Sequence, residues 1–167
     1  MSAPHKAVGQ QSIALAIVTV SDSRTPETDE NGRFLQASAA AAGHRIAAYH
    51  LIPDEPERVE AMLEQLSASE AQVLIFNGGT GIAPRDTTCD VLSRRLDRAL
   101  PGFGELFRAL SYTEIGPSAM LSRAVAGTFR GKFIFAVPGS PAAVRLAWEK
   151  LIEPELRHVV GELNRAT

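Results

Sequence analysis

Residues 73–86 read Val73-Leu74-Ile75-Phe76-Asn77-Gly78-Gly79-Thr80-Gly81-Ile82-Ala83-Pro84-Arg85-Asp86. The apolar start of this stretch is typical of a strand buried on both faces. A strand that ends in a glycine-rich turn is where open α/β sheets bind phosphorylated ligands, because glycines let backbone N–H groups approach an anion. The hydroxyl pair Thr87-Thr88 is placed to start a helix, whose N-terminus would add partial positive charge. An aspartate beside phosphates requires a cation between them, so the stretch predicts a nucleotide or phosphate site with a divalent metal.

The glycine turn also has a purely structural interpretation, as a tight turn that needs positive φ angles. Two familiar phosphate motifs are excluded. The turn has no lysine, so it is not a P-loop, and Pro84 stands where a dinucleotide fingerprint would place its third glycine.

Composition favours a single globular domain without a nucleic-acid or membrane role. The 167 residues are 45% hydrophobic, and the formal charge of −2 offers no attraction to nucleic acid or anionic membranes. No apolar run reaches 18 residues, and the single cysteine, Cys89, cannot form an internal disulfide. We therefore expect a cytoplasmic protein with a flexible N-terminus at residues 1–11 and one domain at residues 12–167.

The order of elements predicts the fold class. Strands are expected at 13–20, 45–52 and 73–77, and the helices between them start near Asp29 and at Pro56. Such a βαβαβ start predicts parallel strands with right-handed crossovers and helices on both faces. We expect a Rossmann-like, three-layer α/β/α sandwich with a mostly parallel sheet.

The second half of the chain adds helices and a hairpin. Helices are expected at 88–100 and 105–110, with a turn at 101–104 between them. A β-hairpin is predicted at 124–137. A long helix is expected at 142–161, and Pro154 should kink or restart it.

Parallel strands bring the turns that follow them to one edge of the sheet. Asp22, Asp54 and Asp86 should therefore meet in one crevice although they lie far apart in sequence. Asp54 and Asp86 could instead cap the helices that follow them. Beside a phosphate turn, the pair suits Mg²⁺, which takes one or two carboxylates, substrate phosphates and several waters.

Three other side chains leave alternatives open. Arg85 either balances phosphate charge or pairs with a neighbouring acid. Cys89 has no histidine near it in sequence and is interpreted as a space-filling residue rather than a nucleophile. Glu105 either starts a helix or lies on an adaptable loop near the crevice, because Gly102 and Gly104 precede it.

These motifs together resemble the MoaB/MogA family of molybdenum cofactor biosynthesis. The resemblance spans about residues 12–160, and residues 111–127 resemble the MoaB branch in particular. It is carried, in family order, by Thr19-Val20-Ser21-Asp22-Ser23-Arg24, Ile52-Pro53-Asp54-Glu55, Gly78-Gly79-Thr80-Gly81 with Pro84-Arg85-Asp86, Pro101-Gly102-Phe103-Gly104-Glu105, and Pro138-Gly139-Ser140-Pro141.

The resemblance implies an adenylyltransferase. Its reaction transfers AMP from Mg·ATP to the terminal phosphate of molybdopterin and releases pyrophosphate. Asp54 and Asp86 would then serve catalysis and hold the metal. The implied nucleotide phosphate ligands are Gly78, Gly79, Thr80, Gly81, Gly139 and Ser140, and the implied molybdopterin contacts are Ser21, Asp22 and Glu105.

The family also implies assembly into homo-trimers or homo-hexamers. Two alternative functions are a non-catalytic molybdopterin-binding or scaffold protein on the same fold, and a nucleotide hydrolase or kinase. The absence of a P-loop lysine counts against the last.

Overall fold

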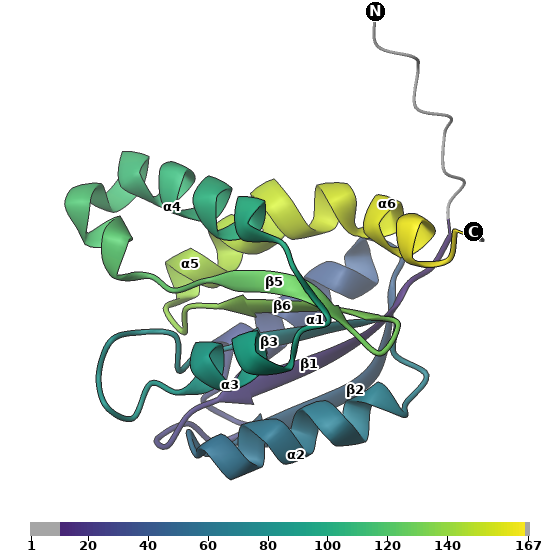
Figure 1. The fold of residues 1–167 in the computed structure, drawn as a ribbon, viewed down its shortest axis with the longest axis horizontal. Helices are drawn as coiled ribbons and strands as arrows, with labels where there is room; N and C mark the ends of the chain where they lie inside the picture. Colours follow the sequence, from purple (N-terminus) through teal and green to yellow (C-terminus); the bar gives the residue numbers. More distant parts are fainter. Residues whose placement is uncertain (1–10, 166–167) are drawn as a thin grey trace, which may run out of the picture.

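One six-stranded sheet forms the centre of the protein in the computed structural model, which describes residues 11–165 (Figure 1). Its strand order is β2-β1-β3-β6-β5-β4. The first four strands in this order pair in parallel, whereas β5 pairs antiparallel with both β6 and β4. The strands are β1 (Ala14–Val20), β2 (Arg45–Ile52), β3 (Val73–Asn77), β4 (Arg98–Ala99), β5 (Val125–Phe129) and β6 (Lys132–Val137). The predicted flexible N-terminus lies almost wholly outside the described residues.

Helical segments cover both faces of this sheet, and Figure 1 shows α2 on one side with α4 and α6 on the other. The segments are α1 (Glu30–Ala41), α2 (Pro56–Ser67), α3 (Thr88–Arg95), α4 (Pro101–Ile115), the 3₁₀ helix η1 (Gly116–Leu121), α5 (Pro141–Ala147), the π-turn η2 (Trp148–Ile152) and α6 (Glu153–Leu163). The predicted three-layer α/β/α architecture with an added hairpin is confirmed.

Alternation along β3 divides the core into two halves. Val73 and Ile75 pack under α1, α4, α5 and α6, whereas Leu74 and Phe76 pack under α2 and α3. All four side chains are fully buried, as the continuous apolar run predicts for a central parallel strand.

The strand order creates a crevice beside β1. The chain passes from β1 to β2 on one side, and then returns to place β3 on the other side of β1. Since right-handed crossovers in opposite directions put their helices on opposite faces, α1 and α2 separate at this point. The carboxyl ends of β1 and β3 are therefore left open between the two layers, which is where open α/β sheets bind ligands.

Two predicted helix boundaries are wrong. The helix expected at 88–100 ends at Arg95, because Arg98 and Ala99 pair with β5 instead. The turn expected at 101–104 is the first turn of α4, which Pro101 starts with its pre-set φ angle. Helix α4 then runs to Ile115 and stops at Gly116, whose φ is +64°.

Pro154 interrupts the last helix as expected. The five-residue π-turn η2 comes between α5 and α6, and Pro154 lies in the first turn of α6. Proline has no N–H to donate to a helical hydrogen bond, so the helix widens into a π-turn one turn before Pro154. Within residues 11–165, no helix has both the length and the apolar character needed to cross a membrane.

Asp29 fixes the start of α1. Its carboxylate accepts hydrogen bonds from the Gly32 N–H at 2.9 Å and from the Tyr49 hydroxyl at 2.6 Å, and the residue is fully buried. Burial and the bond to Asp29 raise the pKa of Tyr49, so the phenol stays a donor. The cap thereby ties α1 to the edge strand β2.

We expect Asp29→Ala to lower the free energy of unfolding by about 2–3 kcal/mol, since it removes a cap and leaves the Tyr49 hydroxyl without its partner. Urea denaturation measures the change. The control is Glu30→Ala, at the exposed next position, which should change stability by less than about 0.5 kcal/mol. Equal losses in the two variants would contradict this role for Asp29.

Candidate functional site

The glycine turn packs more tightly than any side chain would allow. Gly78 has a φ of +100°, and a Cβ there would lie 2.1 Å from the Val20 carbonyl oxygen. Gly79 has a φ of +67°, and its Cβ would lie 2.2 Å from the Thr88 hydroxyl oxygen and 2.7 Å from an Asp54 carboxylate oxygen. The positive φ angles of this turn require glycine. The absence of a Cβ also lets the backbone lie directly against polar side chains.

A cleft of about 530 Å³ opens above this turn. Its walls are the turns that follow β1, β2, β3 and β6, together with α4 and η1. The sequence-predicted residues that line it are Ser21, Asp22, Asp54, Gly78, Gly79, Thr80, Gly81, Asp86, Gly139 and Ser140. Four turns distant in sequence therefore meet in space, as the topology predicts.

Asp54 is a buried carboxylate inside this cleft. It is 8% exposed, and the N-cap of α2 is Glu55, so Asp54 does not cap that helix. Burial raises the pKa of its carboxyl group, and the nearby carboxylates of Asp86 and Asp22 raise it further. Hydrogen bonds from Thr87 offset only part of this effect. The position favours a bound cation.

Asp86 also has a role other than capping. The N-cap of α3 is Thr87. One carboxylate oxygen of Asp86 accepts a hydrogen bond from the Ala83 N–H at 3.0 Å, which closes the loop between Gly81 and α3. The other oxygen has no hydrogen bond within residues 11–165. Asp86 therefore presents a carboxylate at the end of the glycine turn.

Asp22 is the third carboxylate, and Arg85 neutralises it. The Asp54 N–H donates to Asp22 at 3.0 Å, and the Arg85 guanidinium lies 2.8 Å from the same carboxylate. These contacts hold the pKa of Asp22 below its usual value, the hydrogen bond from Asp54 being the larger cause. Of the two interpretations of Arg85, the structure supports pairing with a neighbouring acid.

The donor set fits a hard cation such as Mg²⁺. Asp54 and Asp86 supply carboxylate oxygens, and the buried Thr88 hydroxyl oxygen has no hydrogen-bond partner among residues 11–165. Within the described chain, no three His, Cys, Asp or Glu side chains converge as a metal cage. A cation here would take its remaining ligands from substrate phosphates and water, the usual arrangement for magnesium.

Comparison with known proteins identifies the family of this chain. Residues 16–158 match the family model described as "Probable molybdopterin binding domain". The chain belongs to the MoaB/MogA family of molybdenum cofactor biosynthesis. It is 47% identical over 163 residues to "Molybdenum cofactor biosynthesis protein B" of Bacillus cereus, with 96% of each chain covered.

Solved structures of the family agree in fold. A crystal structure of "Molybdenum cofactor biosynthesis protein B" is 45% identical and superposes with a TM-score of 0.91, covering 94% of this chain and 99% of that one. The "tungsten cofactor synthesizing protein MoaB" of Pyrococcus furiosus is 31% identical, with a TM-score of 0.84 and coverage of 93% and 99%.

Buried amides support the cleft of this MoaB/MogA protein from below, and sequence reasoning missed them. The Asn31 amide donates to the Gly139 carbonyl at 2.8 Å and to the Asn77 side chain at 3.0 Å, and Asn77 donates to the Thr19 hydroxyl at 3.0 Å. The available signal was Asn77 itself, a polar residue that ends an apolar strand.

Ser140 caps α5: its hydroxyl oxygen accepts a hydrogen bond from the Ala143 N–H.

An apolar wall on α4 and η1 was also missed. Phe107, Ile115 and Leu121 line the cleft together with the glycine turn. The helix expected at 105–110 contains Phe107 but ends before Ile115, and the helical turns expected at 119–123 did not place Leu121 at the cleft.

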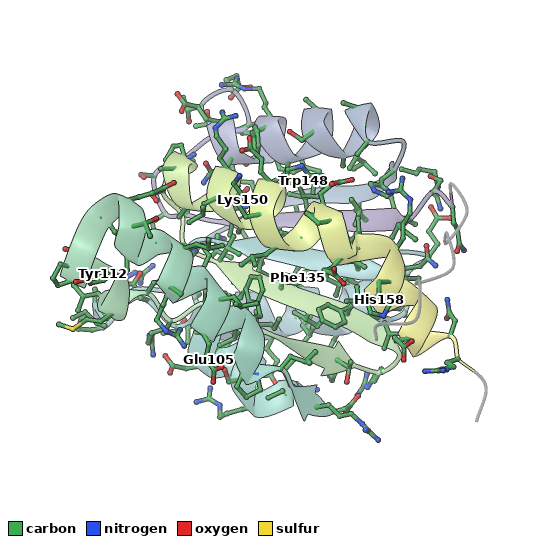
Figure 2. The ribbon with its side chains drawn as sticks, turned by 90° about the horizontal axis from the view of Figure 1, so that it is seen from above. Glu105, Tyr112, Phe135, Trp148, Lys150 and His158 are labelled. Atoms are coloured by element: carbon green, nitrogen blue, oxygen red, sulfur yellow. The ribbon has the colours of Figure 1, made fainter. Side chains whose placement is uncertain are left out.

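Glu105 is the predicted site residue that the structure does not bring to the cleft. It is exposed on α4, where Figure 2 labels it, and lines a second cavity of about 560 Å³ with Cys89 and Arg108. The reason is the early start of α4, which makes residue 105 part of a helix rather than a loop. Cys89 is buried, and burial raises the pKa of its thiol to about 12, which suits a space-filling role.

We expect Gly78→Ala to lower the free energy of unfolding by about 2–3 kcal/mol, because alanine is strained at this φ and would strike the Val20 carbonyl. The matched control is Gly161→Ala in α6, where a Cβ meets open space and should stabilise by up to about 1 kcal/mol. Chemical denaturation compares the two. A Gly78→Ala variant as stable as the wild type would refute the close packing.

Proposed function

We propose that the protein transfers AMP from ATP to the terminal phosphate of molybdopterin and releases pyrophosphate, with Mg²⁺ bound. The observation that carries the proposal is that the buried Asp54 carboxylate and the Thr88 hydroxyl, which has no hydrogen-bond partner within residues 11–165, both lie against the Gly79 backbone. A desolvated carboxylate beside a glycine turn suits a site where a cation and phosphates bind together. Membership of a molybdenum cofactor family supports molybdopterin as the second ligand.

The cleft offers alignment rather than a nucleophile. Within residues 11–165, its lining contains no histidine, cysteine or lysine. The proposed reaction needs none, because the attacking oxygen belongs to the terminal phosphate of molybdopterin. Holding two phosphate-bearing ligands in line and stabilising the developing charge accounts for the catalysis required.

Each part of the cleft has a role in this proposal. Backbone N–H groups of Gly79, Thr80 and Gly81 bind nucleotide phosphates, whereas the Gly78 N–H donates to the Val137 carbonyl and holds the turn in place. The turn at Gly139 and Ser140 borders the same site. Asp54 and Asp86 hold Mg²⁺, which when bound offsets phosphate charge and polarises a phosphoryl group. Ser21 and Asp22 border the molybdopterin part of the cleft, and the Asp22–Arg85 pair keeps Asp22 charged at its rim.

A non-catalytic molybdopterin-binding protein is the alternative. It would bind molybdopterin without producing pyrophosphate, so a pyrophosphate-release assay with ATP, Mg²⁺ and molybdopterin separates the two functions. ATP hydrolysis without molybdopterin would indicate a hydrolase instead.

We expect Asp86→Asn to reduce pyrophosphate release at least about 100-fold, as loss of a charge-stabilising group in a phosphoryl-transfer site does. Its thermal unfolding should stay close to that of the wild type. Glu105→Gln serves as the matched control and should keep turnover within about twofold, because Glu105 lies outside the cleft. Unchanged turnover in Asp86→Asn would refute the role of Asp86, and a large loss in Glu105→Gln would restore Glu105 to the site.

Assembly into a homo-trimer or homo-hexamer belongs to the same proposal. Large apolar side chains are exposed along α4 and η1, among them Leu106, Tyr112, Ile115, Met120 and Leu121. Of these, Leu106 also lines an apolar groove of about 900 Å³ between α4 and α6, where Figure 2 shows Phe135 on the sheet between the two helices. Apolar surface of this extent is typical of protein interfaces.

Light scattering should therefore give a mass of three or six times the 17.9 kDa of one chain. Met120→Glu should shift the mass toward the monomer, because it places a charge on the most exposed apolar residue. Glu114→Gln, near the C-terminal end of α4, is the control and should leave the mass unchanged. A monomeric wild type would refute the proposed assembly.

A further inference from the structure

Arg123 connects the glycine turn to its surroundings through four hydrogen bonds. Its guanidinium donates to the Gly81 carbonyl at 2.8 Å through Nε and to the Asp86 carbonyl at 2.6 Å through Nη2. Nη1 donates to the Asp90 carboxylate at 2.8 Å, and the Arg123 N–H donates to the Thr80 carbonyl at 3.3 Å. One residue therefore holds both ends of the loop that carries Asp86.

Arg123 approaches this loop from outside the cleft. It lines the second cavity with Cys89 and Arg108, and the cleft-lining residues do not include it. Each guanidinium nitrogen donates one hydrogen bond within the protein, and Arg123 borders the second cavity instead of the cleft. Its action on the site must pass through the backbone it holds.

Peptide geometry tells which way the loop N–H groups point. In a trans peptide the carbonyl and the following N–H point in opposite directions, and the described chain has no cis peptide bond. Since the Thr80 and Gly81 carbonyls face Arg123, the N–H groups of Gly81 and Ile82 face away from it. Within residues 11–165 neither N–H has a hydrogen-bond acceptor, although Ala83, the next residue, donates to Asp86.

We infer that Arg123 is a positioning residue that orients the glycine turn for the phosphates of the nucleotide. By holding three carbonyls on the outer side of the loop, it leaves the Gly81 N–H directed to the cleft side. It contacts Asp86 through the main-chain carbonyl, so it does not use the carboxylate oxygen that the Ala83 N–H leaves for the cation. The inference rests on the proposed function, because it names the nucleotide as the ligand of this turn.

The role requires an arginine rather than any cation. The planar guanidinium presents donors in a fixed fork, which here reaches Gly81 and Asp86 at the same time. A lysine ammonium at this position can reach one carbonyl but lacks the fork that spans both. Arg123→Lys therefore keeps the charge and removes the geometry.

The test is Mg·ATP binding measured by calorimetry for the wild type, Arg123→Lys and Arg123→Ala. We expect both variants to bind Mg·ATP about tenfold more weakly or worse, as loss of a charge-assisted contact does. Molybdopterin binding by Arg123→Lys should stay within about twofold. Arg108→Ala is the matched control: within residues 11–165 the Arg108 side chain hydrogen-bonds only to the Ser122 carbonyl, so its loss should leave Mg·ATP affinity unchanged.

The outcomes separate the two claims. Wild-type affinity for Mg·ATP in Arg123→Lys overturns the inference and leaves the proposed function standing. An equal loss of Mg·ATP and molybdopterin binding also overturns it, because that pattern means general damage to the fold. Failure of the wild type to bind Mg·ATP overturns the proposed function and the inference with it. If Arg123→Ala does not fold, Arg123→Lys decides.

Discussion

The site depends on one close approach, that of the Gly78 backbone to the carbonyl end of β1. A single methyl group at residue 78 would lie 2.1 Å from the Val20 oxygen, so only glycine lets the turn after β3 lie flat against β1. The same constraint holds on the other side, where a Cβ on Gly139 would lie 3.1 Å from the Gly78 Cα. Three parallel strands thus end in backbones packed directly against each other, and the cleft is the space above them.

Two of the carboxylates in this cleft, Asp22 and Asp54, have pKa values shifted in opposite directions. Asp22 is compensated by Arg85 and by the Asp54 N–H, and the pKa of its carboxyl group is lowered. Asp54 forms no ion pair within residues 11–165, is buried, and has a raised pKa. One carboxylate is therefore a structural part of the rim, and the other is left with an unfavourable charge that a bound cation would compensate. The difference arises from bonding partners at Asp22 and from burial at Asp54, not from residue type.

Much of the fold could be predicted because its signals are local. The apolar run of β3 and the Pro56 start of α2 indicate their own boundaries, and both agree with the structure. The convergence of Asp22, Asp54 and Asp86 followed from parallel topology alone. The parts that failed depend on pairing across distance: α3 stops early because Arg98 and Ala99 pair with β5, and nothing near residue 98 signals that pairing.

The site residues that sequence could not place have two different causes. The family resemblance implies a molybdopterin contact at Glu105, and the glycines before it left both a helix start and a loop open, whereas Pro101 starts a helix there. Arg123 lies in a segment whose family resemblance was evident, but its contacts are with residues more than 30 positions away. Side-chain to backbone hydrogen bonds of this kind leave no periodic pattern in a sequence.

The construction of the cleft from four strand ends affects how ligand binding couples to folding. None of these turns is a cleft by itself, so any opening that separates β1 from β3 or β6 destroys the binding surface. A ligand therefore binds only the fully assembled sheet, and its binding free energy adds to the stability of the whole domain rather than to one loop. Occupancy should accordingly slow amide hydrogen exchange across the central strands, far from any atom that the ligand touches.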